Sequence, residues 1–164
     1  MQNQSSKSIG SRVLNLLASN QPWLTLIGRL ILGGVLLTAG ALKVGKPQLS
    51  AMSVRAYELL PTDIANFFGY VLPWFEVALG LLLIIGAGVK VCAALGGATM
   101  LIFIFGISQA WARGLNIDCG CFSAGGVVEP GETNYLSSII RNIGLTIVAI
   151  YLYRFPKGRF GLDK

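Results

Sequence analysis

Four long apolar runs dominate the pattern of hydrophobic and polar positions along the chain. Each can supply about 20 residues, the length that an α-helix needs to cross the hydrocarbon core of a bilayer. The expected spans are about 23–43, 67–87, 91–112 and 135–153. The last run is purely apolar only from Ile143 to Leu152, so its span must begin near Tyr135 and take Arg141 into the outer bilayer. The pattern predicts an all-α membrane protein, a bundle of four transmembrane helices.

The connector after the first span predicts one further helix. Pro47 ends the first helix and Pro61 opens a new turn. Between them, Ala51–Leu60 has the pattern of a short amphipathic helix that lies along the membrane interface. Its apolar side would consist of Met52, Ala56, Leu59 and Leu60.

The first span carries glycines at near-helical spacing, which favours close packing against another helix. These are Gly28, Gly33, Gly34 and Gly40. Arg29 lies about two turns into this span, and we expect its side chain to extend to the lipid headgroups rather than to have a functional role.

Composition and charge agree with a membrane protein. The chain has 164 residues, of which 54% are hydrophobic and only 12% charged, whereas a soluble domain has roughly 25% charged residues. Basic residues gather in the two tails, 1–22 and 154–164, so the net charge of +6 indicates topology rather than nucleic-acid binding. The positive-inside rule predicts that both termini are cytoplasmic and that the loop after the third span faces outward.

That outward loop contains the sharpest chemical signal, Cys119-Gly120-Cys121. Thiols outside the cytoplasm meet an oxidising compartment, and a bridge across one residue would be strained and therefore easily exchanged. Such a bridge closes almost no loop, so a static crosslink would stabilise little. A metal site is not expected, because the chain has no histidine and no other outward cysteine. Cys92 falls near the cytoplasmic face, where we expect a small packed residue.

Two further polar signals lie near this loop. Arg113 could stabilise a thiolate by its charge, or could simply anchor the helix at the interface. Glu76 would lie about 13 Å into the second span and Arg141 about 9 Å into the fourth. An ionisable residue inside a span usually has a partner. We therefore expect Glu76 and Arg141 to pair, either as the polar floor of a site or as a contact that sets helix register.

Pro73, three residues before Glu76, is expected to weaken the second span and to open space between helices. A flat quinone ring would fit an aromatic lining there. The candidate lining residues are Tyr70, Trp74, Phe75, Trp111 and Phe122.

Several short motifs resemble the DoxX-type membrane proteins in order and spacing. They are Ile27-Gly28-Arg29, Ala39-Gly40-Ala41-Leu42-Lys43, Ala56-Tyr57-Glu58-Leu59-Leu60-Pro61, Leu72-Pro73-Trp74-Phe75-Glu76 and Gly80. Arg113-Gly114 followed by Cys119-Gly120-Cys121-Phe122 is similar to the MauE branch, named for methylamine utilisation protein E. Members often have glycine where this chain has Ser123.

The resemblance implies a bundle related in architecture to membrane thiol oxidoreductases of the vitamin K epoxide reductase type. It also implies disulfide exchange outside the cytoplasm, often with a thioredoxin-like partner, and some relatives are linked to quinones. Cys119 and Cys121 match the redox pair, whereas Lys43, Glu76 and Arg113 match recurrent polar positions.

The sequence thus predicts a membrane thiol–disulfide redox protein that meets an extracytoplasmic thioredoxin-like or substrate protein, with quinone as a candidate cofactor. Two other classes stay open. One is a non-catalytic assembly subunit with a structural disulfide. The other is a transporter, which would need a continuous polar path, although the inner half of the bundle offers little besides Arg29.

Overall fold

The computed structural model describes residues 3–118, 126–127, 134–156 and 162. Its elements are α1 (Asn3–Val44), α2 (Pro47–Ala56), α3 (Thr62–Ile85), α4 (Val89–Ala112), β1 (Ile117–Asp118), β2 (Gly126–Val127) and α5 (Tyr135–Arg154). Four segments are long and apolar enough to span a membrane: Gln21–Val44, Thr62–Ile85, Val89–Ala112 and Tyr135–Arg154. The predicted all-α fold with four spans is confirmed, as is a short helix after the first span.

Three helix boundaries differ from the predicted ones, and a proline lies at two of them. α2 starts at Pro47, which fits the first turn because a proline has no amide hydrogen to leave unpaired, and it ends at Ala56 rather than Leu60. α3 begins at Thr62, directly after Pro61, and not near Phe67. α1 continues toward the N-terminus beyond the expected span, with Pro22 inside the helix.

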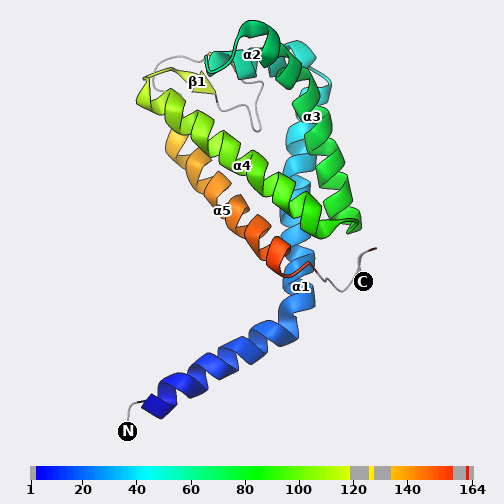
Figure 1. The fold of residues 1–164 in the computed structure, drawn as a ribbon, viewed down its shortest axis with the longest axis vertical. Helices are drawn as coiled ribbons and strands as arrows, with labels where there is room; N and C mark the ends of the chain where they lie inside the picture. Colours follow the sequence, from blue (N-terminus) through cyan, green and yellow to red (C-terminus); the bar gives the residue numbers. More distant parts are fainter. Residues whose placement is uncertain (1–2, 119–125, 128–133, 157–161, 163–164) are drawn as a thin grey trace.

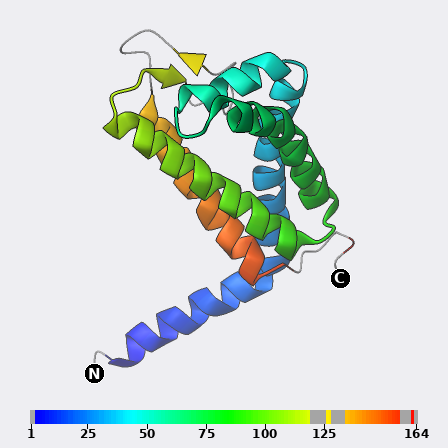
Figure 2. The same ribbon diagram turned by 45° about the horizontal axis from the view of Figure 1, so that its top comes forward.

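The helices form two antiparallel pairs. α3 packs along α1, and α5 packs along α4. α2 lies across one end of the bundle, against α3, and the β1–β2 pair lies beside it (Figures 1 and 2). We call this the outer end of the bundle. At the opposite end, the turn from α3 to α4 contains Gly86 and Gly88, both with positive φ.

Glycines let the backbones of α1 and α3 approach closely. A Cβ atom at Gly80 would lie 2.7 Å from the carbonyl oxygen of Gly33, and one at Gly40 would lie 2.6 Å from the carbonyl oxygen of Pro73. Gly28 faces α5 instead, and Gly34 faces open space. The predicted glycine face is therefore real at Gly33 and Gly40, but Gly34 has no part in it.

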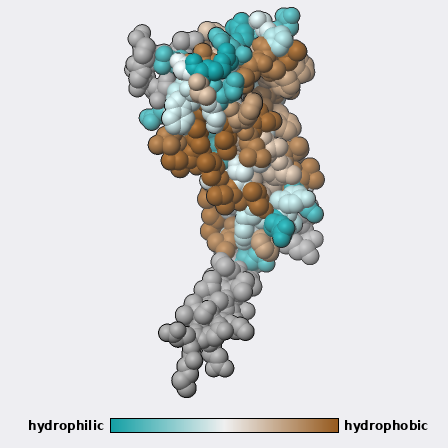
Figure 3. Space-filling view, turned by 60° about the vertical axis from the view of Figure 1, so that its left-hand side comes forward, coloured by the Kyte–Doolittle hydropathy of each residue, from teal (hydrophilic) through white to brown (hydrophobic). Residues whose placement is uncertain are grey.

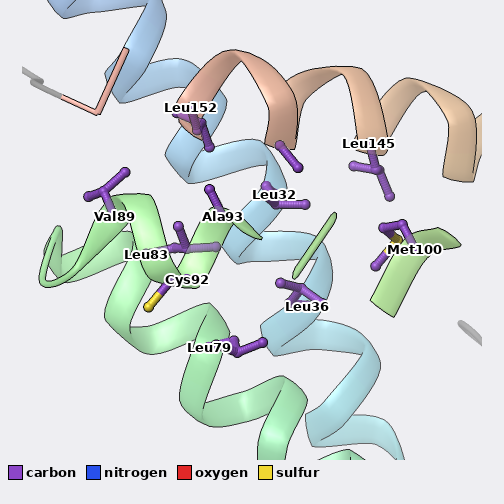
Figure 4. Close-up of a cluster of buried hydrophobic side chains, with 11 residues drawn as sticks. Leu32, Leu36, Leu79, Leu83, Val89, Cys92, Ala93, Met100, Leu145 and Leu152 are labelled. Atoms are coloured by element: carbon purple, nitrogen blue, oxygen red, sulfur yellow. The ribbon is translucent and has the colours of Figure 1, made fainter. Parts of the chain in front are cut away.

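Apolar side chains from all four spanning helices meet in the centre of the bundle (Figure 4). The members of this cluster nearest the outer end, one from each spanning helix, are Leu36, Leu79, Met100 and Leu145, which we call the core layer. Cys92 is 4% exposed within the same cluster, which confirms that it is a packed residue. The four helices thus share one continuous core.

The outer surface of the helices is apolar as well. Four large apolar side chains are each more than 60% exposed: Phe67, Ile102, Phe105 and Ile147. A water-soluble protein rarely exposes so many large apolar side chains on one continuous surface. In Figure 3 hydrophobic residues cover the middle of the molecule and hydrophilic residues gather at the outer end. This belt is the surface that a bilayer covers, and the chain is a multi-pass membrane protein.

One expectation about an individual side chain is wrong. Arg29 does not extend to the headgroups: it is 2% exposed, and its guanidinium donates to the carbonyl oxygens of Leu83 at 2.9 Å and Ile84 at 3.0 Å. These carbonyls end α3 and have no partner within the helix, so Arg29 caps it. In α2, the residues buried inside the protein are small, Ser50, Ala51 and Ser53, and Met52 of the expected apolar side is 47% exposed, as the bilayer-facing side of an interfacial helix is. Gly69 of α3 lets the backbone of α2 approach closely at Ala51, since a Cβ atom at Gly69 would overlap the Ala51 backbone.

Candidate functional site

Cys119 and Cys121 lie outside the residues that the structure describes, so the candidate site is built from its surroundings. β1 and β2 flank this segment and pair antiparallel, Ile117 with Val127 and Asp118 with Gly126. Both strands contact α2. The pairing therefore brings the two described ends of the cysteine segment together at the outer end of the bundle.

A buried anchor holds β1 in place. Ile117 is 1% exposed. The Tyr135 hydroxyl, at the start of α5, accepts from the Ile117 amide at 3.4 Å and donates to the carbonyl of Leu115. The Tyr135 ring stacks on Trp111 of α4, with ring centroids 6.0 Å apart. The start of the cysteine segment is thus tied to the ends of both α4 and α5.

Arg113, the C-cap residue of α4, contacts the connector between α2 and α3. Its Nη2 lies 3.0 Å from Oε2 of Glu58, and its Nη1 donates to the carbonyls of Tyr57 and Glu58. Glu58 has a φ of 50°, an unusual conformation for a residue with a side chain. The described contacts of Arg113 are therefore those of an anchor that holds this connector. Stabilisation of a thiolate by Arg113 stays a prediction.

A buried ion pair lies deeper in the bundle. Nζ of Lys43, near the end of α1, is 3.3 Å from Oε2 of Glu76 on α3, and the two side chains are 11% and 1% exposed. The other carboxylate oxygen, Oε1, has no hydrogen-bond partner among the described residues. The expected pairing of Glu76 with Arg141 is therefore wrong. The reason is the helix arrangement, since α3 packs along α1 and Arg141 belongs to α5, which packs along α4.

Two further residues inside the bundle were not singled out by the sequence. Phe103 of α4 presents its ring to Lys43, with Nζ 5.6 Å from the ring centroid. Asn142 of α5 is 1% exposed, and its Nδ2 has no hydrogen-bond partner among the described residues. A polar residue within a predicted span, directly after Arg141, was the signal that could have identified Asn142.

A cavity of about 580 Å³ opens between α3 and α4 beneath the connector that Arg113 holds. Its lining is almost entirely apolar and includes five aromatic side chains, those of Tyr57, Phe68, Phe75, Phe103 and Phe105. Because both helices are exposed to lipid beside it, the cavity is accessible from the bilayer.

The cavity matches the expected aromatic space only in part. Phe75 lines it, as predicted. Trp74, Tyr70 and Trp111 are instead 64%, 46% and 53% exposed and do not line it, and Phe122 lies outside the described residues. The described part of the chain contains no group of three or more side chains that could hold a metal ion.

Comparison with known proteins agrees with these features. The family model described as "Methylamine utilisation protein MauE" matches residues 21–155, which include all four candidate spans. A methylamine utilization protein MauE from Methylophilus methylotrophus is 26% identical over 140 residues, covering 84% of this chain and 71% of that protein. One from Methylorubrum extorquens is 32% identical over 102 residues, covering 60% of this chain and 52% of that protein. No solved structure matches. With the family model matched across the whole four-helix region, the chain belongs to the MauE family.

Proposed function

We propose that the chain serves methylamine utilisation, as the names of its relatives indicate, in the role of a membrane thiol–disulfide redox protein. Cys119 and Cys121 form the reactive pair and exchange disulfides with an extracytoplasmic thioredoxin-like or substrate protein. One observation carries this proposal: the β1–β2 pair brings both described ends of the cysteine segment together beside α2, at the outer end of the bundle.

The exchange itself needs only thiols and disulfides. A thiolate of one protein attacks the disulfide of the other, a mixed disulfide forms, and the second cysteine of the attacking pair resolves it. One pair ends oxidised and the other reduced, so two electrons pass between the proteins. Electron transfer in either direction passes through the same mixed disulfide.

The topology that this function requires has both chain termini in the cytoplasm. Thr25 of α1 donates its hydroxyl to the carbonyl of Phe155 at 3.1 Å, so the start of the first span and the end of the fourth lie together. α2 and β1 lie at the opposite end (Figure 1). Basic residues in both tails then favour a cytoplasmic location for the tails and an extracytoplasmic one for the cysteine segment.

Quinone is the candidate cofactor, and the α3–α4 cavity fits it. The cavity is large enough for a substituted ring, it opens to the bilayer where such molecules dissolve, and the rings of Phe75 and Phe103 are among its walls. When bound, a quinone would supply a two-electron, two-proton acceptor. The chain's own part is to hold the ring away from water between α3 and α4.

The test is capture of the mixed disulfide in native membranes. Cys121→Ser and Cys119→Ser each leave one cysteine of the pair, so one of them should accumulate a covalent adduct with its partner on a non-reducing gel. Cys92→Ser is the matched control: it removes a cysteine that is 4% exposed in the core and leaves the pair intact, so the second cysteine can resolve the mixed disulfide and no adduct should accumulate. If neither variant forms an adduct and growth on methylamine survives the loss of both cysteines, the chain is an assembly subunit instead.

A further inference from the structure

A second cavity, of about 390 Å³, lies in the other helix pair, between α4 and α5, and shares no lining residue with the α3–α4 cavity. Small residues form its walls, among them Ala93 and Gly97 of α4 and Ala149 of α5. A Cβ atom at Gly97 would lie 3.1 Å from the Cβ of Ala149, so the two helices pack closely here. The small side chains leave a hollow between the helices, which we call the α4–α5 groove.

The α4–α5 groove is open to the bilayer and apolar along most of its length. Two of its lining residues, Leu101 and Ile150, are 56% and 59% exposed on the surface that lipid covers. Thr146, which also lines the groove, already donates its hydroxyl to the carbonyl of Asn142 at 2.8 Å. This part of the groove therefore fits a hydrocarbon chain rather than a polar molecule.

The length of the α4–α5 groove matches one leaflet. It runs along α4 from Ala93 to Leu101 and along α5 from Arg154 back to Thr146. Each stretch rises about 12 Å at 1.5 Å per residue. Half of the hydrocarbon core of a bilayer is about 15 Å thick. The groove thus extends from the end of the bundle that holds the α3–α4 turn, which we call the inner end, to near the middle of the membrane.

Two cationic side chains lie at the inner end of the groove, one from each helix. Arg154, the last residue of α5, lines the groove itself. The ring of Tyr153 lines it as well, and Nζ of Lys90, in the first turn of α4, lies 5.2 Å from the centroid of that ring. Both cations are exposed, and within the described part of the chain neither forms a salt bridge. The groove therefore has an apolar body and a positively charged mouth.

We propose that the α4–α5 groove is a binding site for an anionic phospholipid of the leaflet at the inner end, which is the cytoplasmic leaflet in the topology proposed above. One acyl chain lies in the groove beside Ala94 and Ala98, and the phosphate group contacts Lys90 and Arg154. Basic pockets between spanning helices are a recognised kind of site for anionic headgroups. A zwitterionic lipid offers the same chain but brings a positive charge of its own to the mouth.

A second copy of the chain is the other candidate occupant, because small residues also favour contact between helices. The charges favour the lipid instead. Copies in one membrane share one orientation, so the inner end of a second copy, with its own basic tails, would face Lys90 and Arg154. Like charges brought together at an interface weaken association. An anionic headgroup is complementary to the same mouth.

The test is native mass spectrometry of the full chain, released from a neutral detergent after incubation with equal amounts of phosphatidylglycerol and phosphatidylcholine that have identical acyl chains. One phosphatidylglycerol per chain should be retained, with a preference of roughly 10- to 30-fold, since each basic residue contributes about fivefold to attraction of an anionic lipid. Lys90→Gln with Arg154→Gln should abolish the preference. Both side chains are exposed, and an unchanged circular dichroism melting curve verifies the fold.

The matched control is Lys46→Gln with Arg55→Gln, which removes the same net charge from exposed positions at the outer end and should keep the preference. Ala98→Leu fills the groove from an exposed position. It should lower retention of phosphatidylglycerol about tenfold, the equivalent of roughly two lost methylene contacts.

Three results would overturn the proposal. The first is a native chain without a preference between the two lipids. The second is a preference that survives Lys90→Gln with Arg154→Gln, or that the control at the outer end lowers equally. The third is a dimer that Ala98→Leu dissociates, which would assign the groove to a second copy of the chain.

Discussion

Replacing Lys43 by methionine removes the ammonium partner of a carboxylate that has almost no contact with solvent. Glu76 is 1% exposed, and Lys43 makes its one hydrogen bond among the described residues. Methionine has a similar length and an apolar body, so the change removes the charge and retains most of the volume. In the Lys43→Met variant Glu76 is a buried carboxylate without a counter-charge.

The size of the effect follows from the geometry. Two unit charges 3.3 Å apart attract by roughly 5 kcal/mol at an effective dielectric constant of about 20. Measured losses on removing one member of a buried pair are about 3–5 kcal/mol. We therefore expect the unfolding equilibrium of Lys43→Met to shift by about 100-fold or more. Replacing both members, Lys43→Met with Glu76→Leu, leaves no orphaned charge and should recover most of this loss.

The assay is reversible unfolding in mixed micelles, followed by circular dichroism, on both single variants and the double variant. Lys46→Met is the matched control, because Lys46 lies three residues further along the chain and its side chain is exposed. It should change stability by less than about 1 kcal/mol. If the losses of the two single variants simply add in the double variant, the ion pair contributes nothing specific and the reasoning from its geometry fails.

Three further predictions rest on single contacts. Gly40→Ala would place a Cβ atom 2.6 Å from a backbone oxygen of α3, so unfolding titrations should show a loss of about 1–3 kcal/mol, whereas Gly34→Ala, which faces open space, should be near neutral. Arg29→Met releases two carbonyls at the end of α3 and should cost about 3 kcal/mol in the same titrations; a loss no larger than that of an exposed arginine would contradict the cap. Arg113→Gln breaks a contact with Glu58 in which the side chains are 37% and 61% exposed, so we expect a loss below about 1 kcal/mol that shrinks further in high salt.

The span pattern was readable from the sequence because it depends on a strong, local signal. A bilayer demands about 20 apolar residues in a helix, and proline and glycine mark the ends. The errors at the boundaries arose where a proline starts a helix, as Pro47 starts α2, rather than merely ending the previous one. The packing of Cys92 was also predictable from local sequence, because this small residue lies within an apolar span.

The partners of buried charges were not readable, because they depend on which helices pack together. Depth along the spans allowed Glu76 to meet Arg141, but α1 supplies Lys43 at the same level. Likewise, the pattern around Arg29 could not reveal that the end of α3 lies beside it. The aromatic lining was only partly predicted, since the exposure of Trp74 depends on the face that α3 turns to α1.

The location of the Lys43–Glu76 pair has a consequence for biogenesis. Both residues belong to the first half of the chain, in helices that touch backbone to backbone at Gly33 and Gly80. The carboxylate therefore has its counter-ion as soon as the first two spans have been inserted, before α4 and α5 are synthesised. We expect the first helical hairpin to leave the insertion machinery with this carboxylate already paired, and the second hairpin then to assemble onto it.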